Sequence, residues 1–116
     1  MSHPENVLVL PANTQPAAFK DLVQAEAGLV LVDFFATWCP PCQRLVAEIP
    51  NLAGEYPKVK FIKVNVEENE AVASQFNVSS IPHVSFLKAG DGQPQVLETI
   101  VGFNLAKIKQ TLQSLS

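Results

Sequence analysis

The spacing of hydrophobic residues changes along the chain between a pattern typical of strands and one typical of helices. Runs rich in apolar and β-branched residues predict strands, at residues 7–10, 29–35, 59–66, 84–87 and 96–100. Apolar residues three or four positions apart predict helices, at residues 14–27, 40–56, 68–76 and 104–115. The short glycine-containing turn at 89–92 predicts that the last two strands form an antiparallel hairpin.

The predicted elements follow the order β-α-β-α-β-α-β-β-α. Strands that alternate with helices are usually parallel neighbours, because each helix carries the chain back across the sheet. The final hairpin adds antiparallel pairing. The sequence therefore predicts an α/β fold, a central mixed β-sheet flanked on both faces by α-helices, in a single domain over residues 1–116.

Polar and proline residues mark the expected ends of the helices. Asn13 or Thr14 is expected to cap the first helix, and Gly28 to end it. Pro50 lies inside the second helix and should kink it. Asn104 is expected to cap the last helix. The apolar residues expected on the buried faces of the first and last helices are Phe19, Leu22, Val23, Leu105, Ile108, Leu112 and Leu115.

Composition and charge narrow the class of protein. Hydrophobic residues make up 47% of the 116 residues and charged residues 16%, which argues against an intrinsically disordered chain. Eight basic and 11 acidic residues give a net charge of −3, which does not favour binding to nucleic acid or to an acidic membrane surface. No apolar run approaches the roughly 18 residues that cross a bilayer, and the first residues lack the pattern of a signal peptide. We expect a cytoplasmic monomer.

The two cysteines, Cys39 and Cys42, are separated by only two residues, a spacing that favours redox chemistry. Cys39 lies where a predicted strand passes into a predicted helix. Side chains at such a position face free N–H groups and the positive end of the helix dipole, which stabilises a thiolate. Cys42 lies one turn further along, close enough to attack a mixed disulfide formed on Cys39.

Pro40 and Pro41 fill the two positions between the cysteines. Prolines have no N–H group, so the Cys42 amide is the one donor well placed to reach the Cys39 sulfur. We therefore expect weaker stabilisation of the thiolate than a non-proline residue in either position would give.

A zinc site is the alternative reading of the same spacing, because paired cysteines are common half-sites. A structural zinc site needs four ligands, and the other candidates are His3 and His83. The two prolines between the cysteines hinder a chelating loop, so the sequence favours redox chemistry and no bound metal.

The segment from Val30 to Cys42 resembles the active-site signature of the thioredoxin family, and residues 61–66, Ile81-Pro82 and Val101-Gly102 match at the family's intervals. The resemblance covers nearly the whole chain and implies a thioredoxin fold and a cytosolic protein-disulfide reductase without a cofactor of its own. It also implies two kinds of partner. One is an NADPH-dependent, flavin-containing thioredoxin reductase, and the other is oxidised protein substrates such as peroxiredoxins or reductases.

The same resemblance assigns roles to residues. Cys39 would be the nucleophile, Cys42 the resolving thiol, Asp33 the buried carboxylate that assists proton transfer at Cys42, and Lys63 its charge partner. The residues themselves support the pair, because Asp33 and Lys63 are opposite charges inside apolar strands, where a buried charge is costly unless paired. A purely structural ion pair is the alternative.

Pro82 matches the family's cis-proline, beside which a substrate strand would pair with the backbone of Ile81; an ordinary trans proline is the alternative. The resemblance further implies an apolar docking rim around the dithiol, although any of its apolar members could instead belong to the core. We define the docking rim as Trp38, Pro41, Ile81, Pro82, Val101, Gly102 and Phe103.

Several positions depart from the family's usual residues and leave the redox potential and the choice of partner open. Pro40 replaces a glycine, Phe35 a tryptophan, Gln43 a lysine, Ala47 a proline and His83 a threonine. A titrating histidine near the dithiol could tune activity, or it could be an ordinary histidine on a strand surface. The functional alternatives to a reductase are a disulfide isomerase or oxidase and a non-catalytic binding module with the same fold.

Overall fold

The computed structural model describes residues 5–116. In chain order its elements are β1 (Val7–Val9), α1 (Pro16–Gln24), β2 (Val30–Phe35), α2 (Pro40–Glu55), β3 (Lys60–Asn65), α3 (Glu70–Gln75), β4 (His83–Lys88), β5 (Gln95–Val101) and α4 (Leu105–Leu115). This is the order predicted from the spacing of apolar residues. Within residues 5–116, every helix is too short or too polar to span a lipid bilayer.

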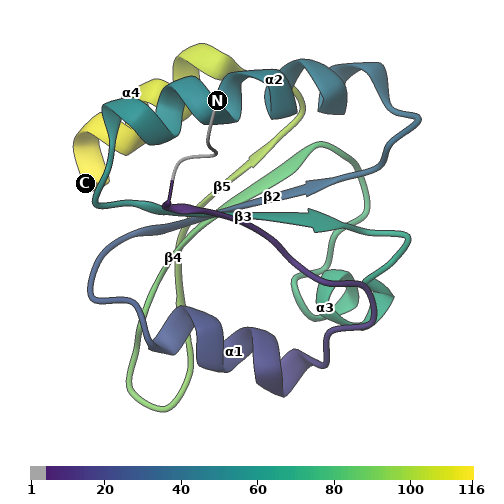
Figure 1. The fold of residues 1–116 in the computed structure, drawn as a ribbon, viewed down its shortest axis with the longest axis vertical. Coiled ribbons are helices and arrows are strands. Elements are labelled where there is room, and N and C mark those ends of the chain that lie inside the picture. The colour runs from purple at the N-terminus through teal and green to yellow at the C-terminus, as the bar shows by residue number, and fades with distance from the viewer. Residues whose placement is uncertain (1–4) are drawn as a thin grey trace.

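The five strands form one sheet in the order β1-β3-β2-β4-β5. Strand β3 runs parallel to β1 and β2, whereas β4 is antiparallel to both β2 and β5. Helices α2 and α4 cover one face of the sheet and α1 and α3 cover the other (Figure 1). The predicted mixed sheet with helices on both faces is confirmed.

The core is divided by the sheet into two apolar layers. Leu31 of β2 packs with Leu45 and Ile108 on the side of α2 and α4, while Val32, its neighbour in the strand, packs with Phe19 on the side of α1 and α3. Successive residues of a strand point to opposite faces, so a strand covered on both sides must be apolar at nearly every position. This accounts for the composition of β2, which is apolar at every position except Asp33.

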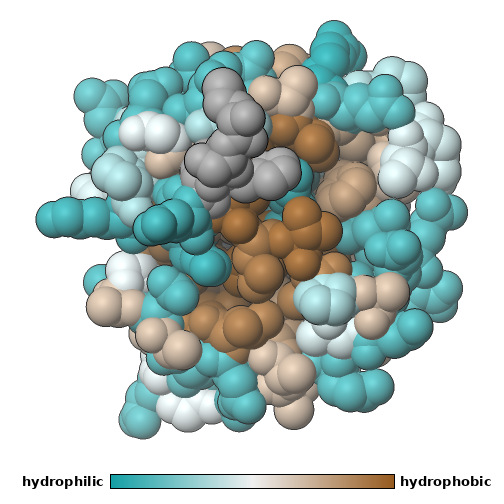
Figure 2. Space-filling model, in the orientation of Figure 1, coloured by the Kyte–Doolittle hydropathy of each residue, from teal (hydrophilic) through white to brown (hydrophobic). Residues whose placement is uncertain are grey.

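Apolar side chains also reach the surface at the edge of the sheet. In Figure 2 they gather at the middle of the face where Figure 1 shows β1. Strand β1 is an edge strand, and Val9 is 58% exposed there.

The start of α1 differs from the prediction. Its N-cap is Gln15, which makes no side-chain capping bond. Asn13 has a positive φ of 60°, and the Thr14 hydroxyl donates to the carbonyl of Pro11 at 2.6 Å. Both polar side chains thus belong to the turn before the helix. The helix also ends earlier than predicted, at Gln24 and not at Gly28.

Two leucines expected in the core are partly exposed, Leu22 of α1 at 37% and Leu115 of α4 at 39%. Each lies on the margin of its helix's apolar face. Leu115 is in the last turn of α4 and lines a surface hollow together with Leu97 of the edge strand β5. The Asn104 cap of α4 is confirmed, since its side chain accepts a hydrogen bond from the Lys107 N–H at 3.1 Å.

Candidate functional site

Cys39 is the N-cap of α2, in the short loop that follows β2. Its backbone is extended (φ −93°, ψ 110°), and its Sγ accepts a hydrogen bond from the Cys42 N–H at 3.3 Å. Pro40 and Pro41 occupy the first two helical positions. The prediction that the Cys42 amide donates to the Cys39 sulfur is therefore confirmed, and the prolines supply no further N–H at these positions.

Both cysteines are free thiols, buried in a small cluster with Ala36. Cys39 is 5% exposed and Cys42 is fully buried. A disulfide can therefore reach Cys39 before Cys42. This order of access matches an attacking thiol with a resolving thiol behind it.

Asp33 is completely buried in β2, and neither oxygen of its carboxylate has a hydrogen-bond partner within residues 5–116. Burial raises the pKa of the Asp33 carboxyl to about 7, while the positive charge of Lys63 acts in the opposite direction. Lys63 is the register neighbour of Asp33 on β3 and is only half-buried. Lys63 therefore acts on Asp33 as an opposite charge in the adjacent strand, as expected of a charge partner, but no hydrogen bond joins the two side chains.

The Cys42 thiol is held in its protonated form. Burial raises its pKa to about 12, assisted by the hydrogen bond with Cys39, and the Asp33 charge acts in the same direction. Cys42 thus needs a base before it can attack a disulfide, and a carboxyl with a pKa near neutrality lies close enough to influence it.

The peptide bond between Ile81 and Pro82 is cis, as predicted. The Cys39 thiol donates to the Ile81 carbonyl at 4.0 Å, and the Gly102 N–H donates to the Pro82 carbonyl at 2.8 Å. These contacts bring together three loops that are far apart in the sequence: the one before α2, the one before β4 and the one after β5.

The docking rim combines exposed and half-buried apolar surface. Trp38 is 65% exposed and Val101 is 55% exposed. Pro82 itself is buried, and the remaining members are half-buried: Pro41, Ile81, Gly102 and Phe103. One further contact could not be predicted from the sequence: Arg44 of α2 lies over the ring of Phe103.

His83 is not on the strand surface. It is 6% exposed, and its ring lies edge-on to that of Phe34 with the centroids 5.4 Å apart. Phe34 faces the layer of α1 and α3, on the other side of the sheet from the layer that Asp33 faces. Burial lowers the pKa of His83 below its ordinary value.

The candidate ligands of the zinc alternative do not form a site in the described part of the chain. No group of three His, Cys, Asp or Glu side chains that could hold a metal ion occurs within residues 5–116. His3 lies outside the described residues.

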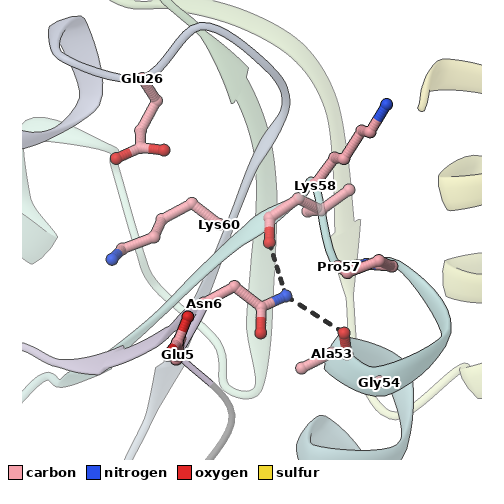
Figure 3. Close-up of a pocket in the computed structure, with 9 residues that line it drawn as sticks. Glu5, Asn6, Glu26, Ala53, Gly54, Pro57, Lys58 and Lys60 are labelled. Atoms are coloured by element: carbon pink, nitrogen blue, oxygen red, sulfur yellow. Dashed lines mark hydrogen bonds between the residues drawn. The ribbon is translucent and has the colours of Figure 1, made fainter.

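A hollow of about 460 Å³ lies beyond the opposite end of α2, away from the cysteines. The Asn6 side chain donates there to the carbonyls of Ala53 and Val59 (Figure 3). It satisfies one carbonyl group in the last turn of α2 and another in the loop that follows, which gives this site a structural role.

The sequence model of the thioredoxin family matches residues 10–114. This chain belongs to the thioredoxin family. Thioredoxins are thiol–disulfide oxidoreductases, and this member is a protein-disulfide reductase that exchanges its Cys39–Cys42 dithiol for a disulfide in cell redox homeostasis.

Curated relatives and solved structures agree with this membership. The chain is 34% identical over 116 residues to thioredoxin Asp f 28 of Aspergillus fumigatus, covering 100% of this chain and 99% of that one. Thioredoxin-T of Drosophila melanogaster is 37% identical over 107 residues, which are 91% of this chain and 66% of that protein. The structure of Trichomonas vaginalis thioredoxin superposes with a TM-score of 0.91 at 37% identity, covering 99% of this chain and 100% of that one.

Another similar structure was solved in a study of how glutathione and thioredoxin systems resolve the thiol of a yeast mitochondrial 1-Cys peroxiredoxin. Its TM-score is 0.83 at 26% identity, and the match covers 98% of this chain and 100% of that one.

Proposed function

We propose that Cys39 attacks the substrate disulfide and that Cys42 resolves the mixed disulfide. The Cys39 thiolate bonds to one substrate sulfur and releases the other as a thiolate, which takes up a proton. Cys42 then loses its proton and attacks the Cys39 sulfur, forming the Cys39–Cys42 disulfide and releasing the second substrate sulfur. Two electrons pass from the dithiol to the substrate. The hydrogen bond from the Cys42 amide to Cys39 at the start of α2 supports these roles.

Asp33 is the proposed acceptor of the Cys42 proton. The two groups interact through their charges, and a carboxyl with a pKa of about 7 can exchange a proton near neutral pH. Lys63 in the adjacent strand favours the charged form of this carboxyl. Asp33 thus acts on the second step of the exchange, in which Cys42 must become a thiolate.

The docking rim is the proposed binding surface for substrate chains. An extended segment would lie against Trp38 and Val101, with its backbone beside Ile81 and its disulfide at Cys39. Oxidised proteins are the proposed substrates, peroxiredoxins among them, because a yeast chain of this fold comes from work on a peroxiredoxin.

An NADPH-dependent thioredoxin reductase is the proposed electron donor. We propose further that residues 1–116 form a single domain that works as a monomer in the cytoplasm. The net charge of −3 and the 16% of charged residues accord with a soluble protein.

Coupled turnover tests this function. With NADPH, a thioredoxin reductase and an oxidised peroxiredoxin, the protein should support continuous NADPH oxidation, and Cys39→Ser should reduce the rate to the uncatalysed background. Rapid oxidation of reduced test proteins without reduction of oxidised ones would instead support an oxidase or isomerase. Binding without any thiol exchange would support a binding module.

A further inference from the structure

An arginine guanidinium is held at the border of the docking rim by an aromatic ring. Arg44 lies two residues after Cys42 in α2 and is exposed. Its guanidinium carbon lies 5.2 Å from the centre of the Phe103 ring. The negative face of an aromatic ring attracts a guanidinium, which limits the freedom of an otherwise flexible side chain. The positive charge is therefore kept at a defined place on the surface.

Phe103 connects this arginine to the loops around the dithiol. Its neighbour Gly102 has a φ of +90° and donates its N–H to the Pro82 carbonyl at 2.8 Å. Ile81, which precedes Pro82, accepts the hydrogen bond from the Cys39 thiol. A protein that approaches Cys39 across the docking rim therefore comes close to the Arg44 charge.

The charges next to the dithiol differ on its two sides. On the α2 side, Gln43 is neutral and its side chain donates to the Thr37 carbonyl, so the next residue, Arg44, supplies the positive charge. On the β3 side, Val66 packs against the cysteine cluster and is followed by two exposed carboxylates, Glu67 and Glu68. A substrate segment lying across the site thus meets positive charge on one side and negative charge on the other.

We propose that Arg44 is a specificity residue, which favours protein disulfides with an aspartate or glutamate near the attacked cysteine. The inference rests on the function proposed above and adds the chemistry of the preferred substrate. A carboxylate can form two parallel hydrogen bonds with a guanidinium, whereas a lysine at the same substrate position is repelled. Apolar contacts with the docking rim hold many extended chains, and the charge discriminates among them.

Short peptides provide the probe. Each contains one cysteine in a disulfide with a small neutral thiol, and a single glutamate is moved through three positions on either side of that cysteine. Matched peptides carry lysine or glutamine instead. At the position that faces Arg44, we expect kcat/KM for the glutamate peptide to exceed that for the lysine peptide about 3-fold, a ratio that falls as salt is added.

Arg44→Gln should bring this ratio to about 1, and Arg44→Lys should retain part of it because the charge remains. Lys58→Gln is the matched control. It removes the same charge beyond the far end of α2, beside the hollow of Figure 3, and should leave the ratio unchanged.

The outcomes separate this inference from the proposed function. Failure to reduce even the glutamine peptides would contradict the proposed function itself. Reduction of all peptides with equal rates for glutamate and lysine at every position would overturn the role of Arg44 alone. A glutamate preference that persists in Arg44→Gln would overturn it as well.

Discussion

Replacing Asp33 by asparagine is expected to raise the free energy of unfolding by up to about 4 kcal/mol at pH 8, and to change it little at pH 4. Burial raises the pKa of this carboxyl from its ordinary 3.8 to about 7. Between these two values the folded protein binds a proton that the unfolded chain has released, so stability falls as the pH rises. Above pH 7 the full cost of the buried charge is present, and the neutral amide avoids it.

Denaturant unfolding of the reduced protein at both pH values measures this effect, with the single tryptophan, Trp38, as the fluorescence reporter. Asp21→Asn is the matched control, because Asp21 is exposed on α1 and loses the same charge. Its change in stability should stay within about 0.5 kcal/mol at either pH. An equal gain for Asp33→Asn at pH 4 and pH 8 would contradict the account, since it would assign the gain to packing instead of charge.

The second large effect is expected from Cys42→Ser, which should stop the reaction at the mixed disulfide. A thiol held beside its target reacts as if at a very high local concentration. Removing it should extend the lifetime of the bond between Cys39 and the substrate on the order of 1,000-fold or more. Incubation with an oxidised peroxiredoxin, followed by non-reducing electrophoresis and mass spectrometry, should reveal a covalent complex that a reductant dissolves.

Cys39→Ser is the control for this trap and should form no covalent complex, because Cys42 is fully buried. Equal amounts of complex from both variants would refute the assignment of an attacking and a resolving thiol. A complex that forms in both variants without any covalent bond would support the binding module.

Features determined by neighbouring residues could be predicted from the sequence. Strand β2 is apolar on both faces because helices cover both sides of it, and its residues alone predicted that burial. The capping hydrogen bond at Cys39 could also be predicted, because its donor is the amide of Cys42, only three positions away in the sequence. The asparagine cap of α4 was predictable for the same reason.

Features that depend on distant contacts were harder to predict. The spacing of Leu22 and Leu115 fits an apolar helix face, but the extent of the sheet beneath each helix decides which residues it covers. Asp33 and Lys63 are register neighbours, yet the burial of one and partial exposure of the other leave the carboxylate without a hydrogen bond. The contact between Arg44 and Phe103 joins two segments that no sequence pattern relates.

The reduction potential of the Cys39–Cys42 couple tests the central claim most directly. The protein is equilibrated in defined redox buffers, and its free thiols are counted by mass tagging. We predict a potential more negative than roughly −250 mV, because the prolines leave the Cys42 amide as the donor to Cys39 and so limit stabilisation of the reduced thiolate form. A value above roughly −200 mV would contradict the reductase and indicate an isomerase or oxidase.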